Sequence, residues 1–141
     1  MRYNIDGGER DFFLENVPVK YFFRYGSESL WIGTDNGLFI KDRTDSFRRF
    51  RHEAGNGNSL PDNVVWSMMS DSGGNVFLCT DNGIVLAETF SDRSFVSVDS
   101  VCGSNEGQDV STMEMDSRGN LWLGGMVQVR QRGSGQEIVP Q

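Results

Sequence analysis

Short apolar runs alternate with clusters of turn residues along this chain of 141 residues. Four runs in one stretch can each form a strand, and they lie at 64–70, 75–80, 84–88 and 94–98. The first three are separated by Asp71-Ser72-Gly73-Gly74 and Asp81-Asn82-Gly83. Runs bounded by Gly, Asn, Asp and Ser predict strands joined by tight turns, and Asn-Gly is a strong hairpin signal. The pattern therefore predicts a unit of four antiparallel strands.

This unit occurs about three times in the chain. Equivalent segments begin at Leu30, Val76 and Leu121 and align without gaps, and the second and third each follow an Asp-Ser-x-Gly-Asn turn. A period of about 45 residues with four strands per repeat is typical of β-propeller blades. The frequent Gly and Asn-Gly turns leave no amphipathic run long enough for a helix. We predict an all-β chain, a β-propeller fragment of about three four-stranded antiparallel blades with no significant helix.

The repeat also predicts the organisation of the chain. In order, we expect outer strands of a preceding blade (1–16), a blade (17–52), an inter-blade loop (53–63), a blade (64–98), a second inter-blade loop (99–108), a partial blade (109–132) and a frayed tail (133–141). The third repeat lacks the Asp-Asn-Gly turn and fades after Val129, and the tail is rich in Gly, Ser and Gln. Such a composition indicates a frayed end.

One aromatic position recurs in the second strand of each repeat, at Trp31, Phe77 and Trp122. We expect these rings to fill the layers between adjacent blades, because an aromatic side chain buries a large apolar area. A sugar-stacking role is the alternative. The Asp-Ser-x-Gly-Asn segments have too few alternating carboxylates for a calcium loop, so we interpret them as turns.

Composition and charge narrow the function classes. Seventeen glycines support the many turns, and a net charge of −7 without a dominant basic stripe argues against nucleic acid as a partner. No run of about 18 apolar residues exists, so we expect no membrane insertion by this chain. Residues 1–15 lack an apolar signal core, which leaves either a cytoplasmic protein or a piece of an exported one. Cys79 and Cys102 fit no metal motif, and whether they form a disulfide stays open.

Three motifs together resemble the two-component regulator propeller repeat over residues 17–127. They are Leu30-Trp31-Ile32-Gly33-Thr34-Asp35-Asn36-Gly37-Leu38, the Asp-Ser-x-Gly-Asn turns, and Asn58-Ser59-Leu60-Pro61-Asp62-Asn63 before Val64. The resemblance implies the periplasmic sensor domain of a hybrid two-component regulator of the Bacteroides type, which responds to polysaccharide breakdown products. The chain departs from the pattern where Cys79 replaces the glycine of the other two repeats. It contains no kinase, receiver or helix-turn-helix sequence, so the resemblance carries no signalling chemistry to it.

A binding site is expected where loops gather. The loop Glu53–Asn63 should share a face with the turns at Asp35-Asn36-Gly37 and Asp81-Asn82-Gly83, and functional residues concentrate on such loops. The candidate ligand- or partner-binding residues, close to the channel mouth, are Asn63, Trp66 and Asp109, and each also has a structural interpretation. A basic segment at 41–52 is interpreted as a charged outer strand and turn, with a site for an anionic sugar or a partner as the alternative.

We expect no catalysis and no cofactor or metal. The only histidine, His52, falls at the end of an outermost strand, and no nucleophile-elbow, zinc-protease or phosphate-loop motif occurs. The alternative is a propeller enzyme, such as a lyase or a glycosidase.

The expected partners follow from the blade count. Three blades cannot close a ring of seven, which needs about 315 residues, and the terminal blades would expose apolar faces. The predicted partner is therefore a second copy of the chain or the rest of a larger sensor, with an oligosaccharide as a possible ligand. A truncated fragment that acts only as a protein-interaction scaffold is the remaining alternative.

Overall fold

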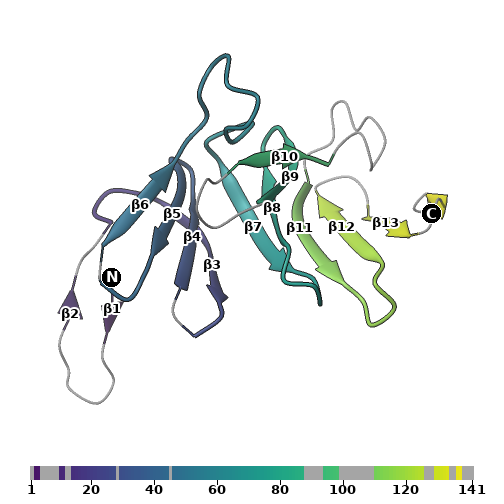
Figure 1. The fold of residues 1–141 in the computed structure, drawn as a ribbon, viewed down its shortest axis with the longest axis horizontal. Helices are drawn as coiled ribbons and strands as arrows, with labels where there is room; N and C mark the ends of the chain where they lie inside the picture. The colour runs from purple at the N-terminus through teal and green to yellow at the C-terminus, as the bar shows by residue number, and fades with distance from the viewer. Residues whose placement is uncertain are drawn as a thin grey trace.

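The computed structural model describes residues 2–3, 10–11, 14–27, 29–44, 46–87, 94–98, 110–125, 129–133 and 136–137. Every regular element in these ranges is a β-strand. Figure 1 shows three sheets side by side, following one another in chain order from the N-terminus to the C-terminus. The predicted all-β propeller fragment of about three blades is therefore confirmed.

Each of the three sheets is a meander of four antiparallel strands, which is the make-up of a propeller blade. The first sheet contains β3 (Val19–Tyr25), β4 (Ser29–Thr34), β5 (Gly37–Lys41) and β6 (Phe47–Phe50). The second contains β7 (Val65–Ser70), β8 (Val76–Thr80), β9 (Gly83–Ala87) and β10 (Phe95–Ser97). The third contains β11 (Val110–Met115), β12 (Leu121–Gly125), β13 (Val129–Gly133) and β14 (Gln136–Glu137).

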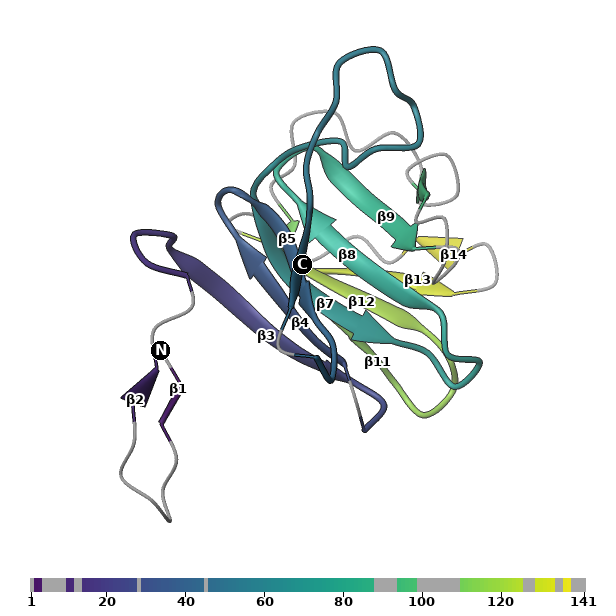
Figure 2. The same cartoon turned by 60° about the vertical axis from the view of Figure 1, so that its left-hand side comes forward.

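A separate hairpin pairs β1 (Arg2–Tyr3) with β2 (Arg10–Asp11). It lies within the stretch 1–16, where the sequence pattern predicts the outer strands of a preceding blade. Figure 2 shows this hairpin standing apart from β3 and from the three sheets.

The third sheet differs from its prediction as a partial blade at 109–132 with a frayed tail at 133–141. β13 ends at Gly133 and pairs with β14, so the sheet has four strands and extends to Glu137. The physical reason is that antiparallel pairing uses backbone N–H and C=O groups, which a Gly-, Ser- and Gln-rich segment also carries.

The tight turns follow from their residues. In the β4–β5 turn, the Thr34 hydroxyl donates to the Gly37 carbonyl at 2.7 Å and accepts from the Asn36 amide at 2.9 Å. Gly37 has a φ of 104°, and the equivalent Gly83 of the β8–β9 turn has a φ of 108°. Asn16 is the only non-glycine among the described residues with a positive φ, so Asp and Asn of these turns are right-handed. The glycine thus takes the one left-handed position that the hairpin requires.

The layer between the first and second sheets is the larger of two cores. Its fully buried side chains come from both sheets and from the loop between them, and they are Trp31, Leu38, Ile40, Leu60, Val65, Met68, Val76, Leu78, Val85 and Phe95. The Trp31 ring packs edge-on against Phe23, with centroids 6.3 Å apart, and lies 5.9 Å from the Tyr25 ring. The Tyr25 hydroxyl donates to the Gly74 carbonyl across the layer at 3.0 Å.

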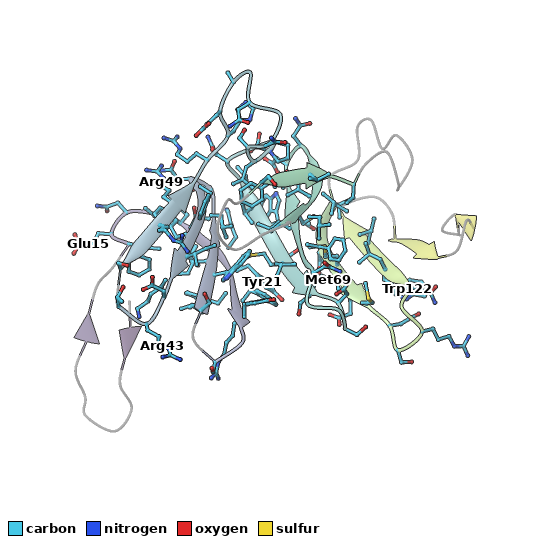
Figure 3. All side chains as sticks on the ribbon, in the orientation of Figure 1. Glu15, Tyr21, Arg43, Arg49, Met69 and Trp122 are labelled. Atoms are coloured by element: carbon cyan, nitrogen blue, oxygen red, sulfur yellow. The ribbon has the colours of Figure 1, made fainter. Side chains whose placement is uncertain are left out.

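The second layer joins the second and third sheets. Met69, Cys79, Ile84 and Val98 of the second sheet or its end pack against Met113, Leu121 and Leu123 of the third, with Phe77 at the margin. Trp31 and Phe77 therefore pack between sheets as predicted. Trp122 does not, because its position faces away from the second sheet and it is 36 % exposed. Figure 3 shows Trp122 on the outer side of the third sheet.

Candidate functional site

The loop between the first two sheets meets the β4–β5 and β8–β9 turns at one end of the sheets. We call this the loop end and define it by residues 35–37, 52–66 and 81–83. The Gly37 amide donates to the Asn63 carbonyl at 2.6 Å, and the Asp81 amide donates to the Val64 carbonyl at 3.2 Å. Figure 1 shows the loop end at the top of the first two sheets. The predicted shared face is thus formed by direct hydrogen bonds.

A β-bulge interrupts the first strand of every sheet near this end. The pairing register shifts between Val19 and Tyr21, between Val65 and Ser67, and between Val110 and Thr112. The extra residues are Lys20, Trp66 and Ser111, which occupy one equivalent repeat position. A bulge turns its side chain away from the regular alternation, and bulges are over-represented beside functional sites. The three innermost strands therefore present one re-aimed side chain each.

Trp66 and Lys20 contact each other across the gap between the first two sheets. The Lys20 Nζ lies 4.7 Å from the centroid of the Trp66 ring, which is within the range of a cation–π contact. The Trp66 Nε1 donates to Asp81 Oδ1 through a short hydrogen bond, which fixes the indole plane. The sequence analysis missed Lys20, although its repeat position equals that of Trp66. The site thus combines an aromatic face, an ammonium group and a carboxylate.

Asn63 has a structural role at the loop end. Its Oδ1 accepts from the His52 amide at 2.8 Å, and its carbonyl accepts from Gly37. These bonds hold the end of the loop against the first sheet and leave Asn63 without the exposed polar groups that ligand binding needs. The third predicted candidate, Asp109, lies outside the described residues.

The basic segment at 41–52 is spread over β5, β6 and the turn between them. Arg49 Nε donates to the Asn36 carbonyl at 3.1 Å, and its guanidinium lies 5.4 Å from the Phe39 ring centroid. Arg48 and Arg49 are adjacent on a strand, so they point to opposite faces of the sheet. The segment is a charged edge strand, which protects an open sheet edge from pairing with other chains. Cys79 is buried with Sγ 2.8 Å from the Val110 carbonyl oxygen, and Cys102 lies outside the described residues.

Asp71 and Asp116 organise the turns at the opposite end of the sheets. The Asp116 Oδ1 accepts from the Arg118 and Asn120 amides, each at 2.9 Å, and its Oδ2 accepts from Asn120 Nδ2 at 2.9 Å and Trp122 Nε1 at 3.0 Å. Asp71 accepts equivalent bonds from Gly73 and Asn75. The side-chain amides of Asn120 and Asn75 are the largest of the causes that lower the pKa of these two carboxyls. Turn formation therefore accounts for these motifs.

Replacing these two carboxylates should remove a pH-dependent part of the stability. A carboxyl whose pKa is lowered on folding stabilises the fold above its unfolded pKa, and this contribution is lost as the pH falls. We expect the Asp71→Asn/Asp116→Asn variant to unfold at a lower urea concentration than the wild type at pH 7, with a difference that shrinks below the ordinary pKa of 3.8. Ser72→Ala, at an exposed side chain of the same turn, serves as the control. A difference that is independent of pH would contradict this role of the charge.

No protein-family model matches this sequence, and no curated protein matches it. Solved structures do match. The extracellular domain described as that of the hybrid two-component system BT3049 of B. thetaiotaomicron has a TM-score of 0.69 and 22 % identity over 99 % of this chain. The extracellular domain described for the hybrid two-component system BT4673 of the same organism has a TM-score of 0.54 and 27 % identity over 97 % of this chain.

This chain spans 20 % of the length of each of these two structures. The part of it that the structure describes contains no helix that could cross a membrane. The structural neighbours confirm the resemblance that the repeat motifs predict: this chain has the blade-repeat fold of extracellular domains of hybrid two-component systems.

Proposed function

We propose that this chain is a non-catalytic binding module in the periplasmic sensor of a hybrid two-component system, and that it binds a polysaccharide-derived saccharide at the loop end. The observation that carries the proposal is the contact between Lys20 and Trp66, two bulge residues on adjacent innermost strands. The extracellular domains with the same fold support the sensor role.

The chemistry of the pair suits a saccharide. Ligand sites combine aromatic surface with a few polar groups that fix orientation. The Trp66 ring offers a flat apolar face for the C–H groups of a sugar ring, and the Lys20 ammonium is a donor for hydroxyl or carboxylate oxygens. Asp81 holds the indole through its Nε1, so the ring is oriented before a ligand arrives. An oriented ring costs less entropy on binding than a mobile one.

The carboxyls and the histidine support a non-catalytic role. Every carboxyl with a shifted pKa in the described part of the chain (Asp42, Asp71 and Asp116) is shifted downward by hydrogen bonds. A general acid near neutral pH needs the opposite shift. The His52 Nδ1 bonds the Leu60 carbonyl at 2.8 Å, so this nitrogen is a donor committed to the loop.

The test is calorimetric titration of the chain with a panel of neutral and uronic-acid-containing oligosaccharides. We expect Trp66→Ala to weaken the binding of any ligand found by about tenfold or more, which is about 1.4 kcal/mol. Trp122→Phe, at an exposed tryptophan on another face, is the control and should bind like the wild type. Absence of binding by the whole panel, or equal binding by Trp66→Ala, would overturn the site. Appearance of shortened oligosaccharides would overturn the non-catalytic role.

A further inference from the structure

We propose that the outer faces of the first and third sheets are complementary, and that a second copy of this chain docks head to tail, with the third sheet of one copy against the first sheet of the next. This inference goes beyond the ligand site and does not depend on it. It rests on repeat positions that are buried between sheets in one part of the chain and exposed in another.

The layer between the first and second sheets shows what such a contact requires. A Cβ placed on Gly33 would lie 2.8 Å from the Val65 carbonyl oxygen and 3.4 Å from the Met68 Cε. The missing side chain of Gly33 therefore lets the next sheet approach closely. Trp31, two residues earlier on the same face of β4, is 1 % exposed in this layer. A small residue and a large aromatic thus form one face, and a valine and a long side chain form the other.

The third sheet repeats the first half of this pair without its partner. Trp122 and Gly124 occupy the positions of Trp31 and Gly33. A Cβ placed on Gly124 would meet only Thr112, a residue of the same sheet, within 4 Å. Trp122 is 36 % exposed. This face therefore has the shape that receives the first strand of another blade.

The first sheet repeats the second half of the pair. Val19 and Phe22 occupy the positions of Val65 and Met68, as the shared bulge in β3 and β7 shows. Val65 and Met68 are 0 % and 1 % exposed, whereas Val19 and Phe22 are 39 % and 60 % exposed. Three of the five exposed large hydrophobic side chains of the described residues thus stand at positions that are buried wherever two sheets meet.

Charge favours the same pairing. Arg24 is exposed on the face of β3 that carries Phe22, and Glu114 is exposed on the face of β11 that lies beside Trp122. Opposite charges on two faces favour contact between unlike faces and disfavour contact of either face with itself. A contact between unlike faces is heterologous, so each copy keeps one face open until a ring closes.

The experiment uses two variants that block one face each, Phe22→Asp and Trp122→Asp, with light-scattering mass measured across a dilution series. The wild type should associate as its concentration rises, and each variant alone should stay at the chain mass of 15.8 kDa. Mixing the two variants should restore one contact, because the first retains its third sheet and the second retains its first sheet. The mixture should therefore form a discrete one-to-one complex that cannot grow.

The outcomes separate this model from its alternatives. A monomeric wild type at every concentration, or a mixture that stays monomeric, would overturn the proposal. A single variant that still dimerises would show contact between like faces and would also overturn it. Val96→Asp, at an exposed residue of the outermost strand β10, controls for the added charge and should associate like the wild type. Circular dichroism confirms that each variant is folded, and none of these substitutions touches Trp66.

Discussion

Trp31→Ala is expected to lower the free energy of unfolding by about 3–5 kcal/mol, the range for removing a large aromatic side chain from a core. Trp31 is 1 % exposed and packs against Phe23 and Tyr25 in the layer between the first two sheets. A domain of ordinary stability has about 5–15 kcal/mol in total, so this loss should unfold a large part of the population. Urea unfolding followed by circular dichroism measures it as a lower midpoint at an unchanged slope.

Trp122→Ala is the matched control, because both tryptophans occupy the same repeat position. Trp122 is 36 % exposed and donates one hydrogen bond to Asp116. Its replacement should cost less than about 1 kcal/mol at a protein concentration where the chain is monomeric. Equal losses in the two variants would mean that the outer face of the third sheet is covered in solution, or that Trp31 does not hold the first layer together.

The strands and turns could be predicted because the repeat presents the same local signals more than once. Asp71 and Asp116 illustrate this: two turns of matching sequence form matching hydrogen bonds, and each bond lies within five residues of chain. The strand pair at the end of the third sheet could not be predicted. Its pairing depends on β12 already being in place, and the sequence of the tail carries no apolar alternation to signal it.

The candidate site was predicted in part. The position of Trp66 beside the loop followed from the repeat, but its partner Lys20 did not. A bulge moves one residue out of the regular alternation, and nothing in the sequence marks which residue that is. Asn63 looked available because it lies in an Asn-rich loop, but its side chain bonds the backbone of His52, eleven residues earlier. Loop hydrogen bonds of this kind depend on the path of the whole loop.

Leu60→Ala is the second large effect that we expect. Leu60 is 0 % exposed, although the rest of its loop is largely on the surface, and it packs among the core residues of the first layer. Its neighbours fix the loop on either side: the Asn58 carbonyl accepts from the Phe95 amide at 2.8 Å, and Leu60 itself accepts from His52. Removing the side chain should cost about 2–5 kcal/mol, because a cavity forms between two sheets that are fixed elsewhere.

The consequence should reach the candidate site, because the same loop continues into Asn63 and Trp66. The loop's hydrogen bonds contribute only about 0.5–1.5 kcal/mol each against competition from water, so the buried leucine is its main anchor. Limited proteolysis within residues 53–59 should therefore be faster in Leu60→Ala than in the wild type at equal fraction folded. Leu60→Met, which keeps the side-chain volume, should cost less than about 1.5 kcal/mol and keep the loop protected. Leu14→Ala, at the half-buried equivalent position before β3, should cost less than Leu60→Ala. If the two alanine variants lose equal stability and the loop stays protected, the hydrogen bonds alone anchor it and the leucine does not.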